Sequence, residues 1–433
     1  MKKNSITKIL FFTVFISLQY EEVYGNELIL KELHSSKLIT ASKESNREII
    51  FTDRNLELGI RGKIKKPKGN ITIKDVKNIN ELTLNHEYIS SLEGIQYLKG
   101  LRKLDLRFNN IKDISPLSYL INIERLNLGY NQINDIKPLS KLINLKELNL
   151  MSNKISDLVS LESLTNLMIL DLYHNNLTNI QPLSKLTNLN SLDLYMNKIE
   201  DISQLQSLIK LTDLSLGMNN ISDIGPLKGM KSLKTLEAAE NKIIDVSPLS
   251  NLTELNYLYL YGNRIDNVDF LKNLIKLVYL DLSNNGISDI KPLGKLINLR
   301  FLGLDNNNVS SLTGIGSAKN LESIRIEKNE VCCLEELKSL TKIKSLVLSN
   351  NKIISVKQLE VLSNLSFLNI SGNQIEDISP IRSLPELALT NIEFSDNPLP
   401  KYIFNEKLKD KFILCTLSLY INEEIKRYYG EYR

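Results

Sequence analysis

The stretch LRKLDLRFNNIKDISPL, residues 101–117, contains the pattern that decides the fold. It follows the order L-x-x-L-x-L-x-x-N-x-I-x-D-I-x-P-L around one asparagine, and this pattern returns along the chain every 22 residues without an insertion. A self-similar unit of this length cannot cover its own apolar face, so it stacks on its neighbours and forms a solenoid. The asparagines that mark the period are Asn109, Asn131, Asn153, Asn175, Asn197, Asn219, Asn241, Asn263, Asn285, Asn307, Asn329, Asn351 and Asn373.

Each unit contains a short L-x-L segment, such as Leu104 to Leu106. In an extended strand alternate side chains share a face, so these leucines point inward and the residues between them point outward. Neighbouring strands lie about 4.8 Å apart, and stacked units therefore build one parallel sheet. The predicted fold class is α/β: a right-handed solenoid with about 15 parallel strands on its concave face.

The recurrence of asparagine and of proline at fixed positions in the repeat can be explained physically. Where the chain leaves the strand, its backbone groups turn away from the sheet and meet no water inside the solenoid. An amide both donates and accepts hydrogen bonds, so stacked asparagines are predicted to bond the backbone of their own and adjacent units. Proline has no N–H and fixes φ, which suits a tight turn or the first position of a short convex helix. The prolines concerned are Pro116, Pro138, Pro182, Pro226, Pro248, Pro292 and Pro380.

The first 25 residues have the features of a secretory signal peptide. Lysines precede an apolar run from Ile9 to Leu18, and Val23 and Gly25 are placed for cleavage before Asn26. The run is too short to span a bilayer, and no later stretch reaches spanning length. We therefore expect a secreted protein, extracellular or at the cell surface, with no membrane span; a buried N-terminal helix is the alternative.

The remaining segments are predicted to cover the ends of the solenoid. Residues 26–80 form an N-terminal segment and helical cap, with helix starts at Thr52 and Thr72, and residues 81–400 form the repeats. Residues 401–433 form a C-terminal cap, which packs on the last repeat through Phe412, Leu414, Leu417 and Leu419.

Charge and cysteine content exclude several classes of function. The formal net charge is +4 with acids and bases dispersed, which argues against a nucleic-acid partner. Three cysteines make no disulfide framework and no metal spacing. Half-buried thiols are favoured at Cys332 and Cys333 over a vicinal disulfide. No phosphate-binding loop occurs, and no cofactor is predicted.

Aromatic residues concentrate in four columns that lie six, four, two and one residues before each asparagine. Tyrosine has a large apolar body and a polar tip, which is why it recurs in binding hot spots. We therefore predict a protein-binding site with one aromatic group at its centre and a second group extending it toward the N-terminus. The alternative is that stacked rings only stabilise the strands. The first group is Tyr257, Tyr259, Tyr261, Tyr279 and Phe301, and the second is Arg107, Phe108, Tyr130, Tyr173, His174 and Tyr195; beyond them Asp305, Glu327 and Asn369 replace the rings.

Catalysis finds little support in the sequence. The only histidines are His34, His86 and His174, and no serine or cysteine in the four columns completes a relay with His174. Asp171, Asp193 and Asp213 are neighbouring acids that suit calcium or a basic partner, but solvated acids are the favoured interpretation. We predict a protein that is not an enzyme and holds no metal.

The repeats resemble the 22-residue bacterial class of leucine-rich repeat found in internalins. NQINDIKPL (131–139) and NNISDIGPL (219–227) keep its N-x-I-x-D-I-x-P-L signature, and the resemblance covers about residues 51–400. Internalins are secreted or wall-attached proteins whose concave surface binds host receptors. The resemblance therefore implies an adhesin with a role in virulence, whose partner is a protein such as a host surface receptor, or a glycan. Two alternatives stay open: an intracellular scaffold resembling phosphatase-regulator subunits, and a structural surface-layer component.

Overall fold

The computed structural model describes residues 44–384 and 391–399. The expected signal peptide and C-terminal cap lie outside these residues. Within the described part, every strand belongs to one parallel sheet whose spatial order is the sequence order, which confirms the predicted fold class. The strands are β1 (Glu81–Thr83), β2 (Lys103–Asp105), β3 (Arg125–Asn127), β4 (Glu147–Asn149), β5 (Ile169–Asp171), β6 (Ser191–Asp193), β7 (Asp213–Ser215), β8 (Thr235–Glu237), β9 (Tyr257–Tyr259), β10 (Tyr279–Asp281), β11 (Phe301–Gly303), β12 (Ser323–Arg325), β13 (Ser345–Val347), β14 (Phe367–Asn369) and β15 (Asn391–Glu393).

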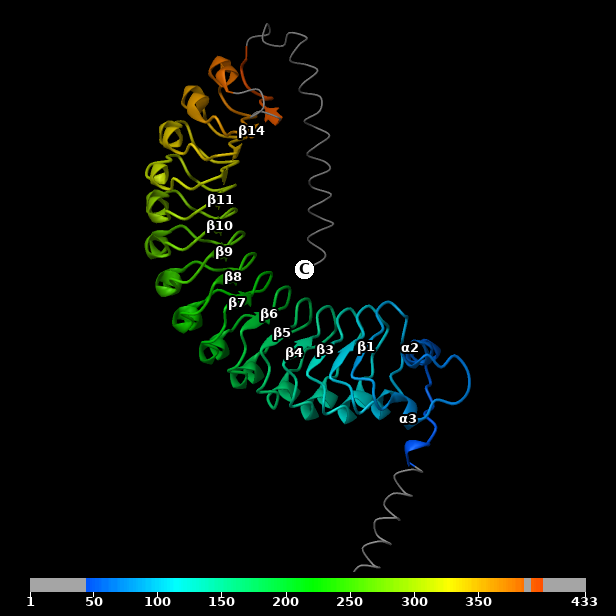
Figure 1. Ribbon diagram of the computed structural model, residues 1–433. Coiled ribbons are helices and arrows are strands. Elements are labelled where there is room, and N and C mark those ends of the chain that lie inside the picture. Colours follow the sequence, from blue (N-terminus) through cyan, green and yellow to red (C-terminus); the bar gives the residue numbers. More distant parts are fainter. Residues whose placement is uncertain (1–43, 385–390, 400–433) are drawn as a thin grey trace, which may run out of the picture.

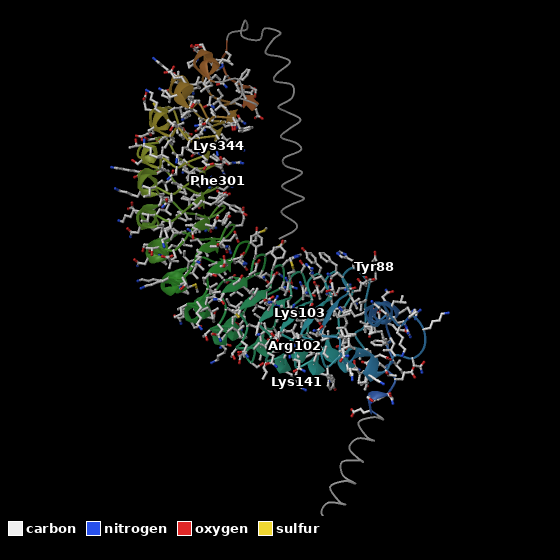
Figure 2. All side chains as sticks on the ribbon, in the orientation of Figure 1. Tyr88, Arg102, Lys103, Lys141, Phe301 and Lys344 are labelled. Atoms are coloured by element: carbon white, nitrogen blue, oxygen red, sulfur yellow. The ribbon has the colours of Figure 1, made fainter. Side chains whose placement is uncertain are left out.

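The repeats form an arc with the strands on its inner side and short helices on its outer side (Figure 1). Proline occupies the first turn of many of these helices, as predicted for a residue without an N–H. Side chains cover both sides of the arc, with Phe301 on the strand side and Lys141 on the helix side (Figure 2). The 3₁₀ helices are η1 (Ile95–Tyr97), η2 (Ser115–Tyr119), η3 (Lys137–Lys141), η4 (Val159–Leu161), η5 (Gln181–Lys185), η6 (Ser203–Ser207), η7 (Gly225–Gly229), η8 (Ser247–Asn251), η9 (Asp269–Asn273), η10 (Lys291–Lys295), η11 (Ile315–Ser317), η12 (Glu335–Ser339), η13 (Lys357–Val361) and η14 (Ser379–Ser383).

The core is one continuous cluster of leucine and isoleucine between the two layers. The strand leucines, such as Leu104 and Leu126, pair with each other in register from one repeat to the next. Because every repeat is in the same register, each apolar column of the sequence becomes a buried ladder along the arc. Within the described residues, no helix is long and apolar enough to cross a bilayer.

The asparagine column forms the predicted amide ladder. In the repeat of Asn131, the side-chain Nδ2 donates to the carbonyls of Leu106 and Leu128 at 3.0 and 2.9 Å. Its Oδ1 accepts the N–H of Ile111, in the preceding repeat, at 3.0 Å. The same donors and acceptors recur along the series, so each amide ties the turn of its own repeat to the repeat before it. A leucine substituted at one of these asparagines would leave these backbone groups buried without hydrogen-bond partners.

A second amide ladder was not predicted from the sequence. Asn144 stands in the loop before β4, and its Nδ2 donates to the carbonyl of Ile121 at 2.9 Å. Asn166 repeats this bond to Ile143 at 2.8 Å. The signal was present as a second asparagine nine residues before the main asparagine, followed by leucine or, at Asn122, by isoleucine. The members of this ladder are Asn122, Asn144, Asn166, Asn188, Asn298, Asn320 and Asn364.

Two helices, α2 (Arg54–Ile64) and α3 (Ile73–Val76), precede the first strand. The predicted capping box is present, since the Asp75 carboxylate accepts the N–H of Thr72 at 2.8 Å. The other expected helix start, Thr52, is wrong by one residue, because Asp53 is the N-cap of α2. Its second carboxylate oxygen accepts the N–H of Ser90 at 2.7 Å, so Asp53 also ties the cap to the first repeat.

Two adjacent asparagines give a matched test of the amide ladder. Asn109 is buried and makes the ladder bonds, whereas its neighbour Asn110 is exposed. Asn109→Ala leaves several buried backbone groups unpaired, so we expect a loss of roughly 2–4 kcal/mol in the free energy of unfolding. Asn110→Ala should change it by less than about 0.5 kcal/mol. Urea unfolding followed by circular dichroism measures both, and equal losses would contradict the ladder's role.

Candidate ligand-binding face

The four predicted columns lie at four defined places in each repeat. The residues six and four before the asparagine are the first and third strand residues, here called the strand-start and strand-end columns. The residue two before lies in the following turn, and the residue one before has a left-handed backbone wherever it is described; these are the turn and left-handed columns. All four therefore face the concave side or its edge, as predicted for a strand with its leucines inward.

The first aromatic group forms a contiguous stack. Tyr257, Tyr279 and Phe301 occupy the strand-start column of β9, β10 and β11 and are paired in register. The rings of Tyr279 and Phe301 are stacked with centroids 4.2 Å apart, and Tyr259 contacts Tyr279 at 4.8 Å. Tyr257 is 44% exposed and the other rings are partly exposed, so the group presents an aromatic surface to solvent.

Tyr261, in the turn column, connects the first aromatic group to the second. Its phenol lies close enough to that of Tyr195, three repeats earlier in the same column, for each to shift the pKa of the other. The two rings reach each other because the intervening turn residues are Gly217 and Ala239. A Cβ on Gly217 would lie 2.5 Å from the ring of Tyr195. Tyr195 in turn stacks on Tyr173 with ring centroids 5.6 Å apart, so Tyr261 is linked to two rings of the second group.

The rest of the second group lies nearer the N-terminus. Phe108 stacks on Tyr130 at 4.2 Å, and Arg107 forms an ion pair with Asp105 at 3.0 Å. His86, which the sequence analysis did not select, extends this stack because it lies 4.2 Å from Phe108. Its position one period before Phe108 was the signal that would have found it. His174 contacts Tyr173 edge-on at 6.0 Å and belongs to the main surface.

The left-handed column changes character along the arc. Its second half contains Gly262, Asn284, Asn306, Asn350, Gly372 and Asp396, which adopt positive φ at little cost, and Lys328 is the exception. Its first half contains rings and long side chains, for which the same backbone is strained. These larger residues are Phe108, Tyr130, His174, Met196 and Met218.

The acids in the strand-end column act as turn caps. The carboxylate of Asp171 accepts the N–H of Tyr173 at 3.0 Å, and Asp193 accepts the N–H of Tyr195 at 2.9 Å. Burial raises the pKa of Asp171 to about 6, with a further contribution from the charge of Asp193. The expectation that these acids are solvated therefore agrees with Asp213, which is exposed, and is wrong for Asp171 and Asp193, which are half-buried and cap turns.

Glu237 caps two turns at once. Its Oε2 accepts the N–H of Gly217 at 2.9 Å, and its Oε1 accepts the N–H of Ala239 at 3.0 Å. Burial raises the pKa of this carboxyl to about 7 despite these hydrogen bonds. Tyr259 stands in the same strand-end column one repeat later, and its phenol cannot take the place of the carboxylate in these caps.

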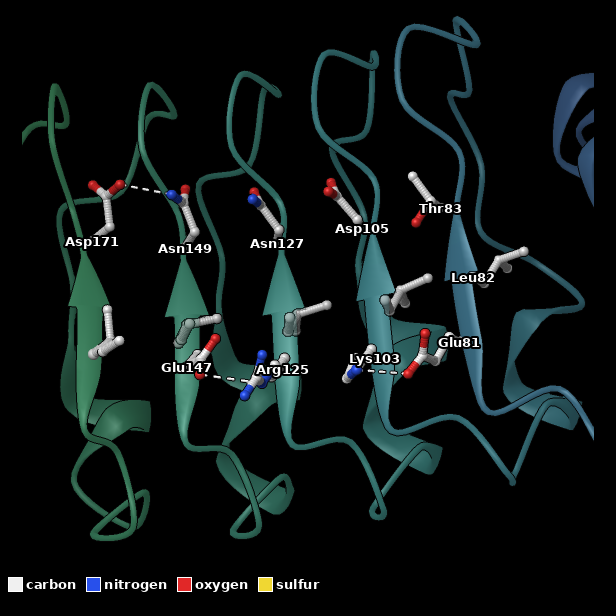
Figure 3. A pocket seen from close by; sticks show the side chains of 14 residues that line it. Glu81, Leu82, Thr83, Lys103, Asp105, Arg125, Asn127, Glu147, Asn149 and Asp171 are labelled. Atoms are coloured by element: carbon white, nitrogen blue, oxygen red, sulfur yellow. Dashed lines mark hydrogen bonds and ion pairs between the residues drawn. The ribbon is translucent and has the colours of Figure 1, made fainter. Parts of the chain in front are cut away.

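Polar residues replace the rings at both ends of the face. Toward the N-terminus, Lys103 pairs with Glu81 at 2.6 Å and Arg125 pairs with Glu147 at 3.1 Å (Figure 3). These pairs line a shallow hollow of about 430 Å³. Toward the C-terminus, Asp305 pairs with Arg325 at 2.8 Å. The change from rings to polar residues was predicted toward the C-terminus, whereas the ion pairs toward the N-terminus were not predicted.

The described residues offer little support for catalysis or metal binding. Ser152 Oγ lies 3.4 Å from His174 Nδ1, and the described residues show no carboxylate bonded to that ring. No group of three metal-ligating side chains occurs within residues 44–384 and 391–399. Cys332 and Cys333 are free thiols with their Sγ atoms 3.2 Å apart, and both are exposed rather than half-buried as expected.

Comparison with known proteins agrees with this geometry. A family model described as leucine-rich repeats (2 copies) matches residues 99–141, 121–163, 165–207, 187–229, 209–251, 231–273, 275–317 and 341–383. A crystal structure of an internalin, inlF, from Listeria monocytogenes is 35% identical with a TM-score of 0.63, covering 70% of this chain and 96% of that one. A search of curated proteins gave no match.

Two further structures have the same architecture. A leucine-rich repeat protein from Leptospira interrogans is 28% identical with a TM-score of 0.67, covering 79% of this chain and 84% of that one. The functional domain of InlJ from Listeria monocytogenes is 22% identical with a TM-score of 0.68, and the match covers 80% of each chain. At that identity the likeness to InlJ concerns the fold alone.

The chain belongs to the leucine-rich repeat family. Within that family it is an internalin-like protein, as the resemblance in its repeats had implied.

The raised pKa of Glu237 predicts a pH-dependent stability. Between about pH 4.5 and pH 7 the folded state holds a proton that the unfolded chain releases, so stability falls as pH rises. We expect a loss of roughly 2 kcal/mol across this window. Glu237→Gln should reduce the pH dependence whatever its effect on absolute stability, whereas Glu360→Gln on the convex side should keep it. Urea midpoints at pH 5 and pH 8 test this, and an unchanged slope in Glu237→Gln would refute it.

Proposed function

We propose that this chain is a secreted, internalin-like protein that binds a protein partner through the aromatic part of its concave face. The partner is a protein outside the cell, such as a host surface receptor, and binding serves adhesion. The chain acts as a non-enzymatic recognition scaffold. Family membership supports the scaffold, and the surface described above supports the binding role.

The partly exposed stack of Tyr259, Tyr279 and Phe301, with Tyr257 exposed in the same sheet, is the observation that carries this proposal. Contiguous aromatic surface open to water is uncommon on proteins that have no partner. The alternative, that the rings only stabilise the strands, does not explain Tyr259. At that place many repeats carry a capping carboxylate or amide, as Asp193 and Asn149 do, so the stability of the turn favours Asp or Asn over Tyr. The column also departs from this choice at Ser215, Gly303, Arg325 and Val347.

Secretion is the second half of the proposal and rests on the N-terminal sequence. Lysines, an apolar run of less than spanning length and a small residue at the cleavage position are together typical of a signal peptide. Secretion separates this function from the intracellular phosphatase-regulator alternative, which has the same repeat length but needs no export.

The double variant Tyr259→Ser/Tyr279→Ser tests the binding face. The mature chain is immobilised, surface proteins of candidate cells are passed over it, and a captured protein is identified and purified. Loss of two hot-spot rings should weaken its affinity at least tenfold. Tyr119→Ser, on the exposed convex side, is the matched control and should bind as the wild type does. Unchanged affinity in the double variant would exclude this site.

The N-terminus of the protein in its own cell tests secretion. We expect the protein in the culture medium or on the cell surface to begin at Asn26, because cleavage after Gly25 follows the small-residue rule of signal peptidases. Mass spectrometry of the N-terminal peptide measures this. Recovery of an uncleaved chain from the cytosol would instead support the intracellular alternative.

A further inference from the structure

Positively charged side chains are missing from the central part of the concave face. From Glu147 in β4 to Asn306 after β11, the four columns contain no lysine or arginine, although the whole chain has a net charge of +4. Glu147 and Asp305, at the two limits, are neutralised by ion pairs with Arg125 and Arg325. The acids between them form no ion pair within the described residues; they are Asp171, Asp193, Asp213, Glu237, Glu240 and Asp281.

Two of these acids are exposed in the repeats that lie between Tyr195 and Tyr261. Asp213 begins β7 in the strand-start column, and Glu240 follows β8 in the left-handed column. They lie in the two repeats between those of Tyr195 and Tyr261, with Asp213 at the start of its strand and Glu240 in the turn after its strand. Neither caps a backbone turn in the way that Glu237 does, so their charges are directed to solvent.

Aromatic faces and uncompensated carboxylates attract the same kind of group. A lysine or arginine side chain gains a cation–π contact with tyrosine and a Coulomb attraction to the acids, both strengthened by partial removal from water. Anionic partners meet repulsion over the same strands. A neutral partner leaves partly buried carboxylates such as Glu237 without a counter-charge. The negative charge of the face therefore favours cationic partners over the neutral and anionic partners that could also contact its tyrosines.

We propose that the concave sheet face from β5 to β10 receives a basic segment of a protein partner. Its lysine or arginine side chains lie against the rings of Tyr195 and Tyr261, between Asp213 and Glu240. This inference rests on the proposed function, because it names the chemistry of the partner that the aromatic face binds. It excludes nucleic acids and anionic glycans as occupants of the same strands.

Three peptides of equal length and equal tyrosine content, one cationic, one neutral and one anionic, are suitable probes. Fluorescence anisotropy with the mature chain measures their affinities at low and at physiological salt. We expect the cationic peptide to bind most tightly and to weaken as salt screens the charges. Asp213→Asn/Glu240→Gln should weaken this peptide roughly tenfold, since each exposed charge contributes up to about 1 kcal/mol. The convex variant Glu360→Gln should leave its affinity unchanged.

The outcomes separate this inference from the proposed function. If a neutral or anionic peptide binds as tightly as the cationic one and Tyr259→Ser/Tyr279→Ser abolishes that binding, the aromatic site stands and its preference for cations is refuted. If the cationic peptide binds but neither the acid pair nor the tyrosine pair matters, both proposals fail. If the cationic peptide does not bind, the inference fails. Circular dichroism of each variant confirms that its solenoid is intact.

Discussion

The structure depends on one constraint: every repeat must satisfy the backbone groups of its turn without water. The main asparagine meets this constraint by bonding carbonyls of two repeats and one N–H of the preceding repeat. A second asparagine, in the loop before the strand, repeats the device on the opposite edge of the sheet. Because both amides link neighbours, they hold each repeat in the register of the one before it. The leucine columns then align into a single core.

The inward residues pack the core and form the hydrogen bonds that the backbone of the turns needs. The outward residues of the strands are therefore less constrained by folding. The strand-end column is a partial exception, since its acids and amides cap the turns that follow them. Tyrosine interrupts that column at Tyr259, and the left-handed column of the first half holds rings on a strained backbone. Departures from the locally favoured residue are expected at functional sites, and these positions therefore support the proposed binding face.

The geometry of the face also explains why the tyrosines act as one surface. Gly217 and Ala239 are small enough for Tyr195 and Tyr261 to meet above them, although the two tyrosines are three repeats apart. The carboxylate of Glu237 lies under this bridge and accepts two backbone N–H groups. Aromatic area and negative charge thus occupy the same strands, whereas the ion-paired rows at each end are electrically balanced.

The sequence by itself determined the repeat length, the inward leucines, the role of the asparagines and the strands that carry the rings. It did so because all of these follow from a pattern that recurs every 22 residues along the sequence. The tertiary structure decided what depends on distances between repeats. The approach of Tyr195 and Tyr261 across three repeats is of this kind. So is the burial of Asp171, which turned an expected solvated acid into a turn cap. The curvature of the arc sets these contacts, and no single repeat encodes it.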